Sequence, residues 1–111
     1  MEAISAKNLN FDQNANTFNT FFGNLPAVKS IDLTNANSPR VTGMAEFFAN
    51  DPQLTAITGL RDIDTDSVTT MDRMFYNDRS LSKIGDLSTW KTGNVTTMSH
   101  MFANGDEPGS T

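Results

Sequence analysis

Three aspartates at alternate positions are the residues whose types and spacing come closest to a chemical site. Asp62, Asp64 and Asp66 have the spacing that opens a calcium-binding loop. Such a loop then needs a glycine and a bidentate glutamate, but Ser67 and Arg73 stand at those places. We therefore predict a solvated acidic turn with no cofactor or metal, and we keep weak calcium binding as the alternative.

Other residues with catalytic potential lack partners in the sequence. His100 is the single histidine, and Arg73 and Glu46 occupy its place in two related segments, so we expect it to be exposed and inert. The absence of cysteine excludes disulfides, thiolate catalysis and cysteine-ligated zinc. No glycine-rich phosphate loop is present. The sequence therefore predicts a protein that is not an enzyme.

Length and charge describe one acidic domain. The 111 residues include 13 acidic and 8 basic side chains, for a net charge of −5. This balance argues against nucleic acid and anionic membranes as partners, because both require clustered lysine and arginine. Apolar runs are too short for membrane insertion. The first five residues lack the basic start and apolar stretch of a signal peptide.

The elements that must carry any site come from an internal repeat. Residues 41–50, 68–77 and 95–104 read VTGMAEFFAN, VTTMDRMFYN and VTTMSHMFAN, with a step of 27 residues both times. A more diverged copy lies upstream at a step of 26, which becomes 27 by Leu33, so one residue is missing between Ile31 and Leu33. A fixed period of this length indicates a solenoid, in which each unit is stable only when stacked on the next.

Each copy reads as a helical piece and an extended piece. Met71, Met74 and Phe75 are spaced i, i+3, i+4, which places them on one helical face and predicts a short helical turn. Extended pieces are expected at residues 28–33, 54–58 and 81–85, one per repeat and stacked in parallel. A third extended piece is expected where each copy begins. The methionines and phenylalanines should form the core, with Phe48, Phe75 and Phe102 in neighbouring layers.

The repeat divides the chain into three parts. Residues 1–14 are an N-terminal cap or a partial repeat, and residues 15–104 form about three and a half repeats. Residues 105–111 are polar, lack an apolar anchor and are predicted to be a disordered tail. The last copy stops after its first piece, so its apolar residues would lie at an open end, through which the chain could associate with itself.

An asparagine recurs at the end of the first piece in every copy. We expect these residues to form a buried ladder in which each side chain bonds the backbone of the adjacent turn. A simple turn role or ligand binding are the alternatives. The four positions are Asn24, Asn50, Asn77 and Asn104.

The longest motifs carry a resemblance to a known repeat. Residues 94–102 read NVTTMSHMF, and residues 81–90 before them read LSKIGDLSTW. They resemble the bacterial surface-protein repeat of about 26 residues, which belongs with the BspA-like leucine-rich repeats. The resemblance implies an α/β repeat: a short leucine-rich-like right-handed solenoid with one short parallel strand and one short helical turn per repeat of 26–27 residues.

The resemblance also implies a role. It points to a non-catalytic cell-surface module, surface-bound or secreted, for adhesion or protein binding, with a protein or glycan on a host or neighbouring cell as partner. A structural stalk or spacer within a larger surface protein is the alternative. Outward-facing strand positions are the expected contacts, namely Lys29, Thr55 and Lys83. Trp90 either anchors a partner or packs against the next repeat.

Overall fold

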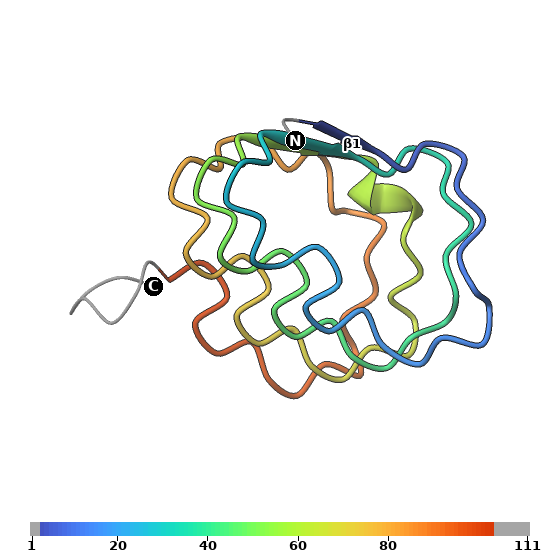
Figure 1. Cartoon of the computed structure of the whole chain (residues 1–111). Helices are drawn as coiled ribbons and strands as arrows, with labels where there is room; N and C mark the ends of the chain where they lie inside the picture. The colour runs from blue at the N-terminus through green and yellow to red at the C-terminus, as the bar shows by residue number, and fades with distance from the viewer. Residues whose placement is uncertain (1–2, 104–111) are drawn as a thin grey trace.

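The computed structural model describes residues 3–103, which wind as successive coils lying side by side (Figure 1). Strands β1 (Ala3–Ser5), β2 (Ser30–Asp32) and β3 (Ala56–Thr58) form a parallel sheet in the order β1-β2-β3. The register is 27 residues between β1 and β2 and 26 between β2 and β3. Strands β2 and β3 therefore lie within the extended pieces that the sequence predicted.

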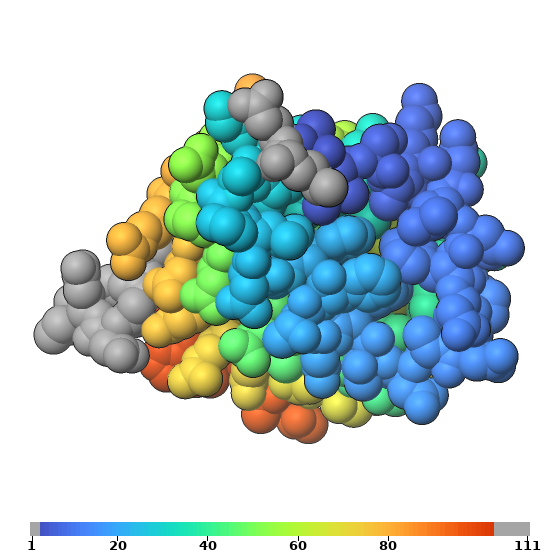
Figure 2. Space-filling view, in the orientation of Figure 1, coloured from blue at the N-terminus to red at the C-terminus, as the bar shows by residue number. Residues whose placement is uncertain are grey.

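Single bridges continue this pairing beyond the named strands. Ala56 pairs with Lys83, in the third extended piece. A second line of parallel bridges joins Thr17 to Gly43, Gly43 to Thr70, and Thr70 to Thr97. The second line lies where each sequence copy begins. A further parallel bridge joins Asn10 to Asn37. Successive coils are thus paired along more than one line, and the space-filling view shows them as bands in chain order (Figure 2).

The repeated methionine–phenylalanine segments are turns, and the expected helical turn does not form there. The one helix in residues 3–103 is the short 3-10 helix η1 (Leu60–Asp62). Arg73 has φ +54°, a left-handed conformation that interrupts any right-handed helix, and Glu46 and His100 repeat it. Arg73 N–H donates to Ser99 O over 2.9 Å. Backbone groups that a helix would use internally are used between coils instead.

Aromatic stacking fills the interior. Phe22, Phe48, Phe75 and Phe102 stand one above another, with ring centroids 5.9, 5.7 and 5.0 Å apart and interplanar angles of 12°, 1° and 11°. Phe48 and Phe75 are almost completely buried, whereas Phe102, on the last described coil, is 49% exposed. The predicted alignment of Phe48, Phe75 and Phe102 in neighbouring layers is confirmed, and such stacking favours one register between coils.

The first residues follow the same register as the repeats. Asn35 donates through its side chain to Asn8 Oδ1 at 2.8 Å, and Asn37 to Asn10 Oδ1 at 2.7 Å, both across 27 residues. Residues of this first segment therefore pair with the next coil at the same step as the repeats do. Asn104 and the predicted tail at residues 105–111 lie outside the described residues.

Gly59 accounts for the change of step from 26 to 27 residues. Strand β3 pairs Thr58 with Asp32 at a step of 26, but three residues after Asp32 the Asn35 N–H donates to Asp62 Oδ2 at a step of 27. The extra residue is Gly59, with φ +85°, and a Cβ there would lie 2.3 Å from Thr34 N. Only glycine fits this position, because both the conformation and the space exclude a side chain.

We predict that Gly59→Ala strongly destabilises the chain. The added Cβ meets backbone atoms of the neighbouring coil, so we expect a loss of about 3 kcal/mol or more in the free energy of unfolding. Gly85→Ala is the matched control, since Gly85 has φ +75° but open space around its Cβ position. That variant should lose only about 1–2 kcal/mol. Urea unfolding of both variants measures the difference, and equal losses would contradict the packing explanation.

Candidate binding groove

A row of asparagines marks the same corner of three successive coils. Asn24, Asn50 and Asn77 have φ values of 60°, 62° and 61°, a conformation that asparagine tolerates better than most residues. Their backbone N–H groups donate to Ala49, Tyr76 and Ala103 of the next coil over 2.7–2.8 Å. Because the three backbones are fixed alike, the three side chains project from equivalent places.

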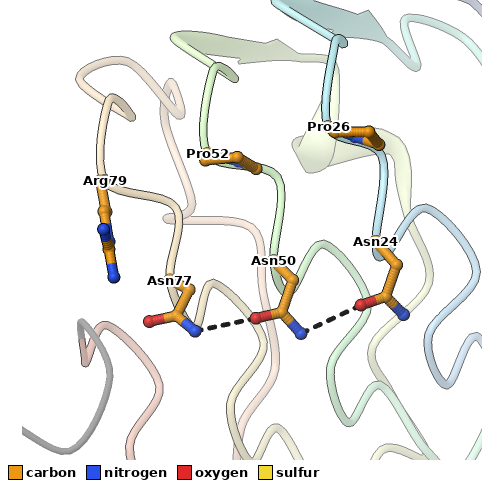
Figure 3. Close-up of a pocket in the computed structure, with 6 residues that line it drawn as sticks. All are labelled: Asn24, Pro26, Asn50, Pro52, Asn77 and Arg79. Carbon is orange, nitrogen blue, oxygen red and sulfur yellow. Dashed lines mark hydrogen bonds between the residues drawn. The ribbon is translucent and has the colours of Figure 1, made fainter.

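The asparagine side chains bond to each other. Asn50 Nδ2 donates to Asn24 Oδ1 at 3.1 Å, and Asn77 Nδ2 donates to Asn50 Oδ1 at 2.8 Å (Figure 3). The predicted ladder therefore exists, but it was wrongly expected to be buried and to bond the backbone. Asn24 is exposed and the other two are half-buried. The backbone acceptors of the neighbouring coil are already taken by backbone donors, which leaves the amides to pair among themselves.

A second row of residues faces the amides across a groove. Pro26, Pro52 and Arg79 occupy equivalent positions, each two residues after an asparagine of the ladder (Figure 3). Together the two rows line a groove of about 450 Å³. Proline fixes φ and has no N–H to leave unpaired, so it suits an exposed wall. The Arg79 guanidinium has no carboxylate at ion-pair distance within the described chain.

Two aspartates lie buried beside this groove. Asp51 and Asp78 directly follow ladder asparagines and are 0% and 7% exposed. Asp51 Oδ1 accepts from Leu25 N–H at 2.9 Å, and Asp78 Oδ1 accepts from Asp51 N–H at 3.0 Å. The carboxylates thus link coils where backbone groups do not pair directly. Their Oδ2 atoms are buried and have no hydrogen-bond partner in the described chain.

Burial makes both carboxyl groups weak acids. Loss of solvation raises the pKa of Asp51 to about 7, against a smaller opposing effect of the Leu25 hydrogen bond. Loss of solvation also raises the pKa of Asp78 to about 8, and the nearby Asp51 charge adds to the rise. Near pH 6 both groups are therefore mainly neutral. Arg79 is then the one ionic side chain among the groove residues.

The three aspartates considered first are each bonded to another residue. Asp64 and Asp66 each lie 3.4 Å from the Arg40 guanidinium, and Asp62 Oδ2 accepts from Asn35 N–H at 2.7 Å. Within residues 3–103, no group of three or more histidine, aspartate or glutamate side chains is arranged to hold a metal ion.

The predicted partner residues fall into two settings. Thr55 and Lys83 are exposed in the parallel pairing, where Lys83 N–H donates to Thr55 O at 3.2 Å and Thr55 N–H donates to Lys29 O at 2.8 Å. These residues form a shared row at the sheet. Trp90 is half-buried against the core, and its indole N–H donates to Leu60 O at 2.8 Å. Trp90 therefore packs against the preceding coil.

His100 is exposed, as the sequence predicted, and lies outside the groove. Its Nδ1 is 2.7 Å from Ser99 Oγ, with no carboxylate at ion-pair distance within the described chain. The sequence analysis predicted the asparagines but not the groove residues Pro26, Pro52 and Arg79. The signal was present, since each asparagine of the ladder is followed two residues later by an exposed side chain at the same turn.

Comparison with known families places the chain in a group defined by such repeats. A family model described as a Mycoplasma protein of unknown function, DUF285, matches residues 16–107, and the chain belongs to this family. No curated protein and no solved structure matches it. In residues 3–103, no helix is long and apolar enough to cross a membrane.

We predict that the chain loses stability as the pH rises from about 5 to 9. In the unfolded chain Asp51 and Asp78 ionise near their ordinary value of 3.8, whereas in the folded chain they retain a proton up to about pH 7 and 8. The proton binding that favours the folded state is complete below the unfolded pKa and is lost as the pH passes the folded pKa. Each pKa unit corresponds to about 1.4 kcal/mol.

The double variant Asp51→Asn with Asp78→Asn should flatten this dependence. An asparagine keeps the acceptor for the neighbouring N–H group but cannot ionise. Thermal melts at pH 5, 7 and 9 measure the effect, with Asp12→Asn, an exposed position, as control. A melting temperature of the double variant that falls with pH as steeply as that of the parent chain would contradict the assignment.

Proposed function

We propose that this chain is a non-catalytic cell-surface repeat module that acts in adhesion or protein binding. We further propose that its coils form a leucine-rich-like right-handed solenoid of the BspA-like type, displayed at the cell surface or secreted. The constant step of 26 or 27 residues between paired backbones supports a stacked architecture. A protein or glycan on a host or neighbouring cell is the proposed partner.

The single observation that carries this proposal is the groove across three coils. It is assembled from equivalent residues of three coils, with a row of amide groups on one side and two prolines and an arginine on the other. A volume of about 450 Å³ lies within the range of small-ligand sites, roughly 300–1,000 Å³. A repeated, partly polar hollow of this kind is suited to recognition, since it offers hydrogen bonds and contact area together.

The sheet row is the competing contact surface. Thr55 and Lys83 project to solvent beside Lys29, as a flat row. Charge reversal by Lys83→Glu should weaken binding through this row and leave the melting temperature unchanged, because the Lys83 side chain is exposed. Variants of the groove and variants of the sheet row therefore distinguish binding at the two surfaces.

We predict that Asn50→Gly weakens partner binding at least about tenfold. Glycine retains the left-handed backbone at this position and removes the central amide of the groove. Asn35→Gly is the matched control, because Asn35 has φ 56° and bonds to Asn8 in a similar pair outside the groove. Binding is measured on arrays of glycans and extracellular proteins, and melting temperatures verify folding.

The outcomes of that experiment separate the hypotheses. Loss of binding with Asn50→Gly alone supports the groove, and loss with Lys83→Glu alone moves the contact to the sheet row. An array on which the parent chain binds nothing overturns the binding function and leaves the spacer function.

The spacer function has its own support at the last described coil. Met98 and Phe102 are 45% and 49% exposed there, although the equivalent Met71 and Phe75 are buried beneath the next coil. An apolar end of this kind favours stacking of further coils or of a second copy.

We predict that Phe102→Ser reduces end-to-end association of the chain. The phenylalanine is the outermost described ring of the stack, so its loss removes apolar area from the end. Sedimentation velocity at rising concentration measures the effect, and Pro52→Ser, at an exposed apolar position of a central coil, is the control. A parent chain that stays monomeric at millimolar concentration would rule out association through this end.

A further inference from the structure

The groove between the asparagine and proline rows has a length that restricts its ligand. Parallel pairing spaces neighbouring coils about 4.8 Å apart, so Asn24 and Asn77 lie about 10 Å from each other. The residues that line the groove are Asn24, Pro26, Asn50, Pro52, Asn77 and Arg79. A ligand of a few rings or a few extended residues fits such a length.

The amides leave donors available for a ligand. Each Asn side-chain nitrogen carries two hydrogens, and the ladder uses one at Asn50 and one at Asn77. Asn24 donates neither of its two within the described chain. Each of the three amides thus keeps at least one N–H group that the ladder does not use. Hydroxyl groups, which accept and donate, match these donors better than a chain of purely apolar groups does.

The backbone around the groove disfavours a peptide. The N–H groups of Asn24, Asn50 and Asn77 are all used between coils, so no free strand edge is available for β-addition. The apolar part of the lining consists of the Pro26 and Pro52 rings, which are exposed and shallow, and not of a pocket for a single side chain. The exposed CH2 groups of these rings can contact the apolar face of a sugar ring.

Charge fixes the remaining feature of the ligand. Arg79 takes the place that proline holds in the two preceding coils, it is exposed, and no carboxylate of the described chain pairs with it. A guanidinium binds a carboxylate through two parallel hydrogen bonds. The buried acids beside it, Asp51 and Asp78, are mainly neutral near pH 6 and do not oppose an anion there.

We propose that the groove binds an oligosaccharide carrying a carboxylate, with Arg79 pairing to the carboxylate and Asn24 and Asn50 donating to ring hydroxyls. This inference rests on the proposed binding function and names the ligand class for the same groove. A carboxylate-bearing sugar unit lies at the Arg79 end, and further units extend toward Asn24 along the proline rings.

Titration calorimetry at pH 6 tests the inference with three probes. They are the trimer of galacturonic acid, its methyl ester and a triglutamate peptide. The acid should bind the parent chain at least about tenfold more tightly than the ester, which has the same rings but no charge. The preference should shrink as salt is raised, because the pair is exposed. Tighter binding of the peptide overturns the ligand class.

Variants at one position isolate the charge. Arg79→Pro installs the residue of the two preceding coils, whose backbone already accommodates it, and should abolish the preference for acid over ester. Arg79→Lys keeps the charge and should retain part of the preference for acid over ester. Arg61→Ala, at an exposed arginine outside the groove lining, is the control and should bind as the parent chain does. Equal binding of acid and ester by the parent chain, or a preference that survives Arg79→Pro, overturns the inference.

The result also separates this inference from the function on which it rests. If Asn50→Gly abolishes binding of an array partner while the galacturonate trimer does not bind, the groove function stands and the ligand class is wrong. If nothing binds the groove in either experiment, both fail.

Discussion

Backbone hydrogen bonds between coils are the constraint on which the other features of the molecule depend. They hold each residue beside its equivalent 26 or 27 positions later, from the strands to the turns. Once that offset is fixed, residues of the same type that recur at this step in the sequence lie next to one another in neighbouring coils. The phenylalanine stack, the amide row and the pair of buried carboxyl groups are all consequences of one register.

The sequence was sufficient for features that depend on periodicity. Equal spacing of Phe48, Phe75 and Phe102 predicts their stacking, since identical side chains at a constant step must meet if the coils stack at all. The same comparison located a missing residue between Ile31 and Leu33, and the structure places the matching extra residue at Gly59, on the paired coil. Parallel strands at the predicted pieces follow from the same alignment.

Features that depend on local backbone conformation could not be predicted from the repeat period. The spacing of Met71, Met74 and Phe75 fits a helix and a run of turns equally well, and the deciding property is the left-handed backbone of Arg73. Arginine has no special preference for that conformation, so nothing in its type reveals it. The conformation is imposed by hydrogen bonds to the next coil, which a single copy of the repeat does not contain.

The sequence predicted one side of the candidate groove but not the other. Recurrent asparagines indicated a ladder, but whether the amides bond backbone or each other depends on which acceptors remain free after the coils pair. Asp51 and Asp78 resemble ordinary turn residues in the sequence. Their burial follows from the phenylalanine stack beside them and from hydrogen bonds that tie each carboxyl group to the previous coil.

The amide row has a direction. Both side-chain bonds run from the later coil to the earlier one, so the dipoles of the three amides point the same way along the stack. Rotating the middle amide alone by half a turn would bring oxygen against oxygen on one side and nitrogen against nitrogen on the other. The three groups therefore reorient together or not at all, and aligned dipoles strengthen one another. A charged molecule that contacts the amide at one end of this row therefore also changes the preferred orientation of the amide at the other end, two coils away.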